Sequence, residues 1–168
     1  VRYGNVIGSR GSVIPLFVRM RSKGILPITD MRMTRFWITL DRGVEFVLQS
    51  LERMAGGEIF APKIPSMRLI DLARAIAPEC ELQEVGIRAG EKLHEVIVGE
   101  DDARHTLEFD DCYVILPAFH DWDSDEYVKQ NGGKRCRDGF TYSSDTNTQW
   151  LTVDALRAML DDHVVANA

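Results

Sequence analysis

The opening stretch VRYGNVIGSRGSVIPLF constrains the fold more than any other part of the chain. Residues 1–5 have the composition of the end of a buried strand, residues 8–12 are small enough for a tight loop, and an apolar segment follows. Ser12 is a preferred residue type for capping a helix, and Gly24 for ending one. The stretch therefore predicts a strand, a loop and a helix over residues 13–23. Because the strand is predicted to be buried, we expect further strands of the same sheet upstream.

Two later segments show apolar residues at the helical spacing i, i+3, i+4 and i+7. One follows caps at Thr39 and Asp41 and ends at Gly56–Gly57, and the other covers residues 69–76. The remaining predicted elements are extended pieces at residues 28–29, 58–61 and 82–87, a hairpin of residues 105–109 and 112–116, a short helix over residues 90–98, a surface loop over residues 120–139 and a final helix over residues 152–160. This alternation is typical of α/β proteins, but it is too sparse for a complete doubly wound sheet.

Composition argues against several classes of protein. A net charge of −6 and a pI near 5.2 are wrong for a nucleic-acid-binding protein, whose binding face is basic. No apolar run approaches the ~20 residues that cross a membrane, so we expect no membrane partner. The candidate metal ligands are too scattered for a metal site, and the separated cysteines favour a reducing, cytoplasmic compartment. These residues are Cys80, Cys112, Cys136, His94, His105, His120 and His163.

Two stretches in the first quarter of the chain carry candidate binding groups, and each has a structural alternative. The loop at residues 6–12 either presents backbone N–H groups to a phosphate at a helix start or is a plain tight turn. In TDMRMTRFW, Thr29, Arg32 and Arg35 alternate with apolar side chains. Arginine matches phosphate oxygens bidentately, but an extended surface segment would show the same pattern.

A third stretch, GIRAGEKLHE, combines an arginine and an acid near a predicted helix start. Arg88 lies in a glycine-flanked turn, and Glu91 lies in the first helical turn, where the helix dipole favours a carboxylate. The functional interpretation is an arginine that pairs with a diphosphate, beside an acid that accepts hydrogen bonds from ribose or sugar hydroxyls. A helix-start acid and a solvated arginine fit the spacing equally well.

The stretches occur together and in a characteristic order: RYGNVIGSRGSVIP, PITDMRMTRFWITLD, GGEIFAPKIPSMRLIDLA, GIRAGEKLHE and FTYSSDTNTQWLT. In this order they resemble the C-terminal half of the inverting UDP-N-acetylglucosamine 4,6-dehydratases. These enzymes belong to the extended short-chain dehydrogenases/reductases and to the wider group of capsule and flagellin-sugar (polysaccharide) biosynthesis proteins. The resemblance runs from Val1 to about Leu160.

The resemblance implies an α/β fold made of the C-terminal part of an NAD(P)-binding Rossmann fold and a small α/β substrate-binding domain. Residues 1–60 would end the Rossmann-type domain, interleaved with substrate-binding segments, and residues 61–168 would form the substrate-binding region. The full enzyme would use NADP, held mainly by the upstream half, and would act as a cytoplasmic homo-oligomer, a dimer or a hexamer. Its product would be a UDP-4-keto-6-deoxy-L-arabino sugar for pseudaminic acid, capsule or O-antigen synthesis.

The resemblance also assigns site residues, none of them catalytic, so this chain alone is expected to be inactive. The expected cofactor-binding residues are Asn5, Val6, Ile7, Gly8, Ser9 and Arg10. The expected substrate-binding residues are Asn5, Val13, Thr29, Arg35, Arg88 and Glu91. Arg35 and Arg88 would hold the diphosphate of the UDP sugar, and Glu91 would bind ribose or sugar hydroxyls. Ala89 departs from the commoner GIRPG pattern but leaves both functional residues in place.

Two alternatives remain open at this point. The chain could come from a related UDP-sugar 4-epimerase or retaining 4,6-dehydratase, because these enzymes differ mainly in upstream active-site residues. It could instead be a non-catalytic module that binds a nucleotide sugar. The second alternative requires the strand at residues 1–5 to be tolerated as a sheet edge.

Overall fold

The computed structural model describes residues 1–9, 12–119 and 122–166, and side chains as far as residue 161. Its elements, in chain order, are β1 (Asn5–Val6), α1 (Val13–Arg21), β2 (Ile25–Ile28), β3 (Thr34–Ile38), α2 (Leu40–Arg53), β4 (Ile59–Pro62), β5 (Ser66–Arg68), α3 (Leu69–Ile76), β6 (Glu81–Glu84), β7 (Val96–Val98), the 3-10 helix η1 (Glu100–His105), β8 (Thr106–Glu108), β9 (Cys112–Ile115), α4 (Ser124–Asn131), β10 (Lys134–Arg135), β11 (Tyr142–Ser143) and α5 (Val153–Ala166). The predicted α/β class is confirmed.

The predicted strand, loop and helix at the start of the chain are present, but the strand is short. β1 pairs in parallel with β3, with Asn5 opposite Trp37, and β3 pairs antiparallel with β5. The prediction that residues 1–5 are buried is wrong, because Val1 and Tyr3 are each more than 40% exposed. In the described part of the chain, β1 is an edge strand, and nothing covers these side chains.

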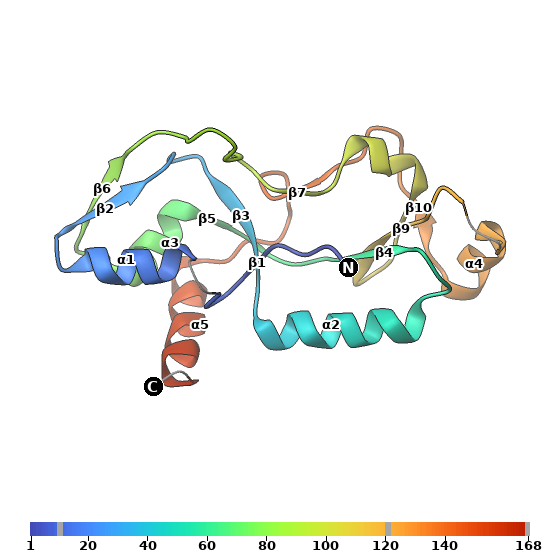
Figure 1. Cartoon of the computed structure of the whole chain (residues 1–168), viewed down its shortest axis with the longest axis horizontal. Helices are drawn as coiled ribbons and strands as arrows, with labels where there is room; N and C mark the ends of the chain where they lie inside the picture. Colours follow the sequence, from blue (N-terminus) through green and yellow to red (C-terminus); the bar gives the residue numbers. More distant parts are fainter. Residues whose placement is uncertain (10–11, 120–121, 167–168) are drawn as a thin grey trace.

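The chain forms two lobes joined by the strands around β1 and β3 (Figure 1). One lobe holds α1, α3 and α5 with the parallel pair β2–β6. The other holds an antiparallel sheet of order β10-β8-β9-β4, in which the predicted hairpin of β8 and β9 is confirmed. Within the described residues, no helix is both long and apolar enough to cross a bilayer.

The predicted helix over residues 90–98 is wrong. Residues 91–95 are irregular, and residues 96–98 form β7. The backbone of this segment bonds to distant partners: the carbonyl of Leu93 accepts from the N–H of Thr34, and the carbonyl of Glu95 accepts from the N–H of Ser144. These long-range hydrogen bonds replace the i to i−4 pattern that a helix would need.

The prediction of a surface loop over residues 120–139 is also wrong for its described part. A helix, α4, begins where the Asp123 carboxylate accepts hydrogen bonds from the N–H groups of Asp125 and Glu126. It ends at Gly132, whose φ of +78° is the left-handed geometry that favours glycine at a helix end. Tyr127 is its one buried residue, so the helix has almost no apolar stripe that a periodicity search could detect.

α2 exposes the apolar stripe by which it was predicted. Val44, Leu48 and Leu51 are each more than half exposed, whereas Phe46 and Ser50 on the other side are buried. Figure 1 shows α2 along the underside of the molecule, with no other element beneath it. An uncovered stripe of this kind marks a surface that a larger assembly would bury.

The main core crosses the predicted domain boundary at residue 60. Ile7 and Phe17 from the start of the chain pack in one cluster with Leu72 of α3 and Leu156 of α5. The core thus contains residues from both sides of this boundary. The division into residues 1–60 and 61–168 stays a prediction. The cluster fixes α1 against α3 and so places the first helix beside β2 and β5.

Gly4 and Gly43 provide a matched test of how closely the chain packs around each of them. A Cβ built on Gly4 would lie 2.4 Å from Cβ of Phe36, whereas a Cβ on Gly43 in α2 would meet no atom within 4 Å. Gly4→Ala is expected to lower the free energy of unfolding by about 1–3 kcal/mol through overpacking. Gly43→Ala is expected to raise it by about 0.5–1 kcal/mol, because alanine favours a helix. Urea unfolding of both variants checks the two signs, and a stabilised Gly4→Ala would contradict the packing described here.

Candidate functional site

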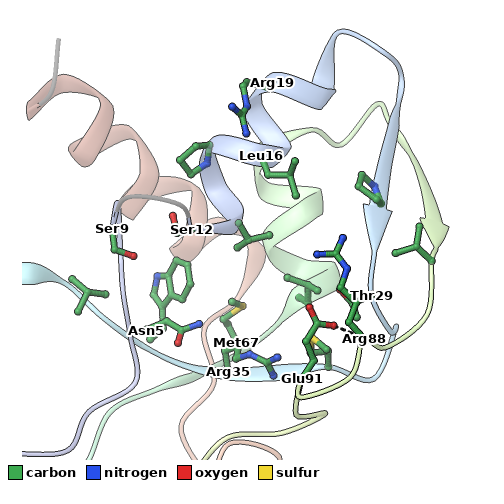
Figure 2. Close-up of a pocket in the computed structure, with 18 residues that line it drawn as sticks. Asn5, Ser9, Ser12, Leu16, Arg19, Thr29, Arg35, Met67, Arg88 and Glu91 are labelled. Carbon is green, nitrogen blue, oxygen red and sulfur yellow. Dashed lines mark hydrogen bonds between the residues drawn. The ribbon is translucent and has the colours of Figure 1, made fainter.

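A cleft of about 700 Å³ lies between α1, β3 and the segment at residues 85–91 (Figure 2). The six residues predicted to bind substrate all line it: Asn5, Val13, Thr29, Arg35, Arg88 and Glu91. They come from five separate parts of the chain, and the fold brings them to one surface. Figure 2 shows Asn5 and Ser9 at one end of the cleft and Thr29, Arg88 and Glu91 at the other.

The helix α1 supplies a wall of the cleft, of which the family motifs predict only Val13. Ser12, Leu16 and Arg19 all line the cleft. Their spacing, i, i+4 and i+7, puts them on one helix face, while Phe17 on another face is buried in the core. Applying the helical period to the polar residues as well as to the apolar ones would have found this wall.

The glycine and serine loop is a tight turn in its described part. The N–H of Ile7 donates to the carbonyl of Ile38, and the N–H of Ser9 donates to the carbonyl of Val6. The N–H of Ser12 donates to the carbonyl of Ser9. These three amides are therefore not available to cradle a phosphate, which favours the tight-turn alternative for this part of the loop.

The predicted cofactor residues are distributed unevenly around this turn. Asn5, Val6 and Ser9 line the cleft, whereas the side chain of Ile7 packs into the core. Gly8 is exposed and has a φ of +74°, which a glycine adopts without strain. Arg10 lies outside the described residues.

The two arginines of TDMRMTRFW have different roles. Arg32 does not line the cleft: its guanidinium binds Asp30 through Nε and Nη2, and its side chain is 72% exposed. The hydrogen bonds from Arg32 lower the pKa of the buried Asp30 to about 2, so the carboxylate stays charged and closes the turn before β3. Thr29, on the other side of Asp30, lines the cleft.

Arg35 binds the backbone of the loop that carries the other charged residues. Its Nη1 donates to the carbonyls of Thr34 and Leu93 at 2.6 and 3.0 Å, and its Nη2 donates to the carbonyl of Lys92 at 2.9 Å. Burial lowers the pKa of Arg35, while the charges of Glu95 and Glu91 act in the opposite direction. The guanidinium keeps its positive charge and one face toward the cleft, with its Nε–H and one Nη2–H free of these three bonds.

Arg88 and Glu91 close a turn on each other. The N–H of Arg88 donates to Oε2 of Glu91 at 3.1 Å, and the N–H of Glu91 donates to the carbonyl of Arg88 at 3.1 Å. Figure 2 shows this contact as a dashed line at the rim of the cleft. The turn uses one carboxylate oxygen of Glu91, so the other oxygen and the whole Arg88 guanidinium remain for a ligand.

A buried hydrogen-bond network fixes the end of the same loop. Thr34 Oγ1 lies 2.8 Å from Nδ1 of His94 and 2.7 Å from Oγ of Ser144. The Ser144 hydroxyl also accepts from the N–H of Glu95, and Glu95 Oε2 accepts from the N–H of Phe36. Burial raises the pKa of Glu95, which the bond from Phe36 and the charge of Arg35 oppose. Ser144, in the FTYSSDTNTQWLT stretch, thus links β3 to the end of the loop at Glu95.

The chemistry offered by these side chains is recognition of an anion. Among the described residues that line the cleft, three are arginines, Arg19, Arg35 and Arg88, and one is an acid, Glu91. The described residues contain no group of three or more potential metal ligands. Burial raises the pKa of Cys112 to about 12 and that of Cys136 to about 11, so neither thiol is a nucleophile at neutral pH.

Comparison with known proteins gives relatives that match nearly the whole chain. The inverting UDP-N-acetylglucosamine 4,6-dehydratase of Campylobacter jejuni subsp. jejuni serotype O:2 is 52% identical over 95% of the chain and 50% of its own length. The UDP-glucose 4-epimerase of Rickettsia conorii is 34% identical over 95% of the chain and 48% of its length. The chain thus spans about half the length of the curated relatives it matches.

The solved structures and the family models agree with these relatives. Pen from Bacillus thuringiensis superposes with a TM-score of 0.78 at 28% identity, over 98% of the chain and 49% of Pen. The resemblance to the inverting 4,6-dehydratases is confirmed by the relatives. The polysaccharide biosynthesis protein model matches residues 1–117, and the chain belongs to this family.

Proposed function

We propose that this chain is the nucleotide-sugar-binding half of a UDP-N-acetylglucosamine 4,6-dehydratase of the inverting type. The observation that carries the proposal is the cleft that contains all six substrate residues expected from the family motifs. Its charged end combines two arginines with an acid, which suits a diphosphate beside ribose or sugar hydroxyls. Relatives at 52–54% identity that are named as this enzyme support the same conclusion.

The proposed role of each residue follows from the hydrogen-bonding groups that it does not use within the chain. Arg88 offers a guanidinium without an internal partner in the described residues, and Arg35 offers the second N–H of its Nη2, because its Nε is ion-paired with Glu95. Glu91 offers one carboxylate oxygen, an acceptor for hydroxyl groups. Thr29 provides a polar contact at the same end of the cleft as Arg88 and Glu91, and Asn5 provides one at the opposite end. The product would be a UDP-4-keto-6-deoxy-L-arabino sugar, a precursor for pseudaminic acid, capsule or O-antigen.

We expect NADP to bind at the end of the cleft that holds Asn5 and Ser9, with this chain supplying a minor part of its site. Val6 and Ser9 line that end, and the turn at Gly8 lets a ligand approach the backbone closely. When bound, the cofactor would supply hydride transfer. The uncovered stripe of α2 and the free edge of β1 are the surfaces on which the rest of a Rossmann sheet would pack, in a cytoplasmic enzyme that forms dimers or hexamers.

A loss of diphosphate recognition tests the binding role of Arg88. In Arg88→Gln, UDP binding by the chain is expected to weaken roughly tenfold, the cost of one charged hydrogen bond, while uridine binding stays unchanged. Isothermal titration calorimetry with UDP and uridine measures both affinities. Arg104→Gln on η1 makes the same charge change outside the cleft and serves as the control. Equal effects of the two substitutions would argue against a diphosphate site.

The buried network behind the loop predicts a positioning role for Thr34. Thr34→Val keeps the shape but leaves Nδ1 of His94 without this partner and removes one of the two hydrogen bonds of the Ser144 hydroxyl, which should cost about 1–3 kcal/mol of stability. Amide hydrogen exchange at Leu93 and Glu95 should accelerate, and UDP affinity should fall. Thr34→Ser keeps the hydroxyl and should restore both. If the valine and serine variants bound UDP equally, the network would have no role in positioning the loop.

The full-length protein that carries this chain tests the reaction itself. Incubation with UDP-N-acetylglucosamine should give a UDP-4-keto-6-deoxy sugar, detected by NMR through its C6 methyl signal. The relatives named as epimerases favour a second candidate, for which the product would keep its C6 oxygen. Formation of a C4 epimer without dehydration would therefore replace the dehydratase proposal by the epimerase one. This chain alone is expected to bind UDP but to give neither product.

A further inference from the structure

Arg19 is a cleft residue whose charge the proposed roles leave unused. It lies in the last turn of α1 and lines the cleft on the same helix face as Ser12 and Leu16. Within the described residues, its guanidinium has no carboxylate partner. A cation near the C-terminal end of a helix is favoured by the helix dipole, so the position alone does not establish a binding role.

Arg21, two positions later, lies at the same helix end and experiences the same helix dipole, but it has a carboxylate partner. Both arginines lie in the last turn of α1, but two helical residues point about 200° apart. Arg21 faces away from the cleft and binds Glu79 through its Nε at 2.5 Å, which raises the pKa of Arg21. Arg19 faces the cleft, where no acid meets it. The same helix end therefore holds one compensated charge and one uncompensated charge.

The charges around the cleft point to what would compensate Arg19. The chain has a net charge of −6, yet the charged side chains that line the cleft are three arginines and a single glutamate, Glu91. Arg35 is already engaged with three carbonyls and lies 3.9 Å from Glu95. The uncompensated positive charge is thus divided between Arg19 and Arg88. Two separated cations suit a ligand with two negative groups.

We propose that Arg19 is a further substrate-binding residue, which contacts a phosphate of a nucleoside diphosphate from the α1 wall of the cleft. This inference rests on the proposed function and extends it. Figure 2 shows Arg19 on α1 and Arg88 on the facing segment, with Leu16 between them in this view. A diphosphate would then be held from both walls, with Arg35 beneath it. Because Arg19 is exposed, salt should screen its contribution more than that of a buried charge.

The test compares two substitutions on the same helix end. Arg19→Gln is expected to weaken UDP binding by about three- to tenfold and to leave uridine binding unchanged. Lys23→Gln, which removes the same charge next to α1 but outside the cleft, is expected to change neither affinity. Arg19→Lys should recover part of the loss, because a point charge remains. Calorimetry at low and high salt should show the difference between Arg19→Gln and Lys23→Gln shrinking as salt rises. Circular dichroism checks that each variant is folded.

The outcomes separate this inference from the function on which it rests. If UDP binds to the unmodified chain no more tightly than uridine, the diphosphate site itself is overturned. If UDP binds well and Arg88→Gln weakens it, but Arg19→Gln matches Lys23→Gln, then only the role of Arg19 is overturned. A loss in Arg19→Gln that appears equally with uridine would assign Arg19 to the helix packing rather than to a phosphate.

Discussion

The bond between the Arg35 side chain and the backbone of residues 92–93 is the interaction on which the cleft depends. A guanidinium in β3 satisfies two carbonyls of a segment that has no regular secondary structure of its own. A charged donor makes a stronger hydrogen bond than a neutral one. Because the segment is fixed to β3 at this point and again at Thr34, the turn of Arg88 and Glu91 is held over the cleft rather than left in solvent.

The arginines of the chain differ in whether a carboxylate binds them. Arg21, Arg32 and Arg53 each bind a carboxylate, and in each case the pKa of the partner acid is lowered. The guanidinium groups of Arg19 and Arg88 line a cleft and have no such partner in the described chain. Both side chains are exposed, so water solvates their charges in the free chain and their N–H groups stay open to an anionic ligand.

The sequence predicted those parts of the fold that local signals determine. The helix α1, with Gly24 after it, and the β8–β9 hairpin follow from caps, turns and periodicity, and the six residues that the family motifs predict to bind substrate all line the cleft. It failed at residues 90–98, where bonds to Thr34 and Ser144 override a local helical preference. It also failed at α4, because caps at Asp123 and Gly132 stabilise a helix that has no apolar stripe. The sequence does not show that Arg19 lines the same cleft as Arg88, because the two residues are distant along the chain.

The exposed apolar stripe of α2 has opposite effects in the chain alone and in a larger assembly. Leu48 and Leu51 are a burden to a chain whose stripe faces water, since exposed apolar surface promotes association. In an assembly that covers the stripe, the same leucines would supply the apolar contact area of an internal interface. A polar substitution there would improve the solubility of the chain while it weakens the larger protein. A polar substitution that the chain alone tolerates at these positions would therefore not show that the larger assembly tolerates it.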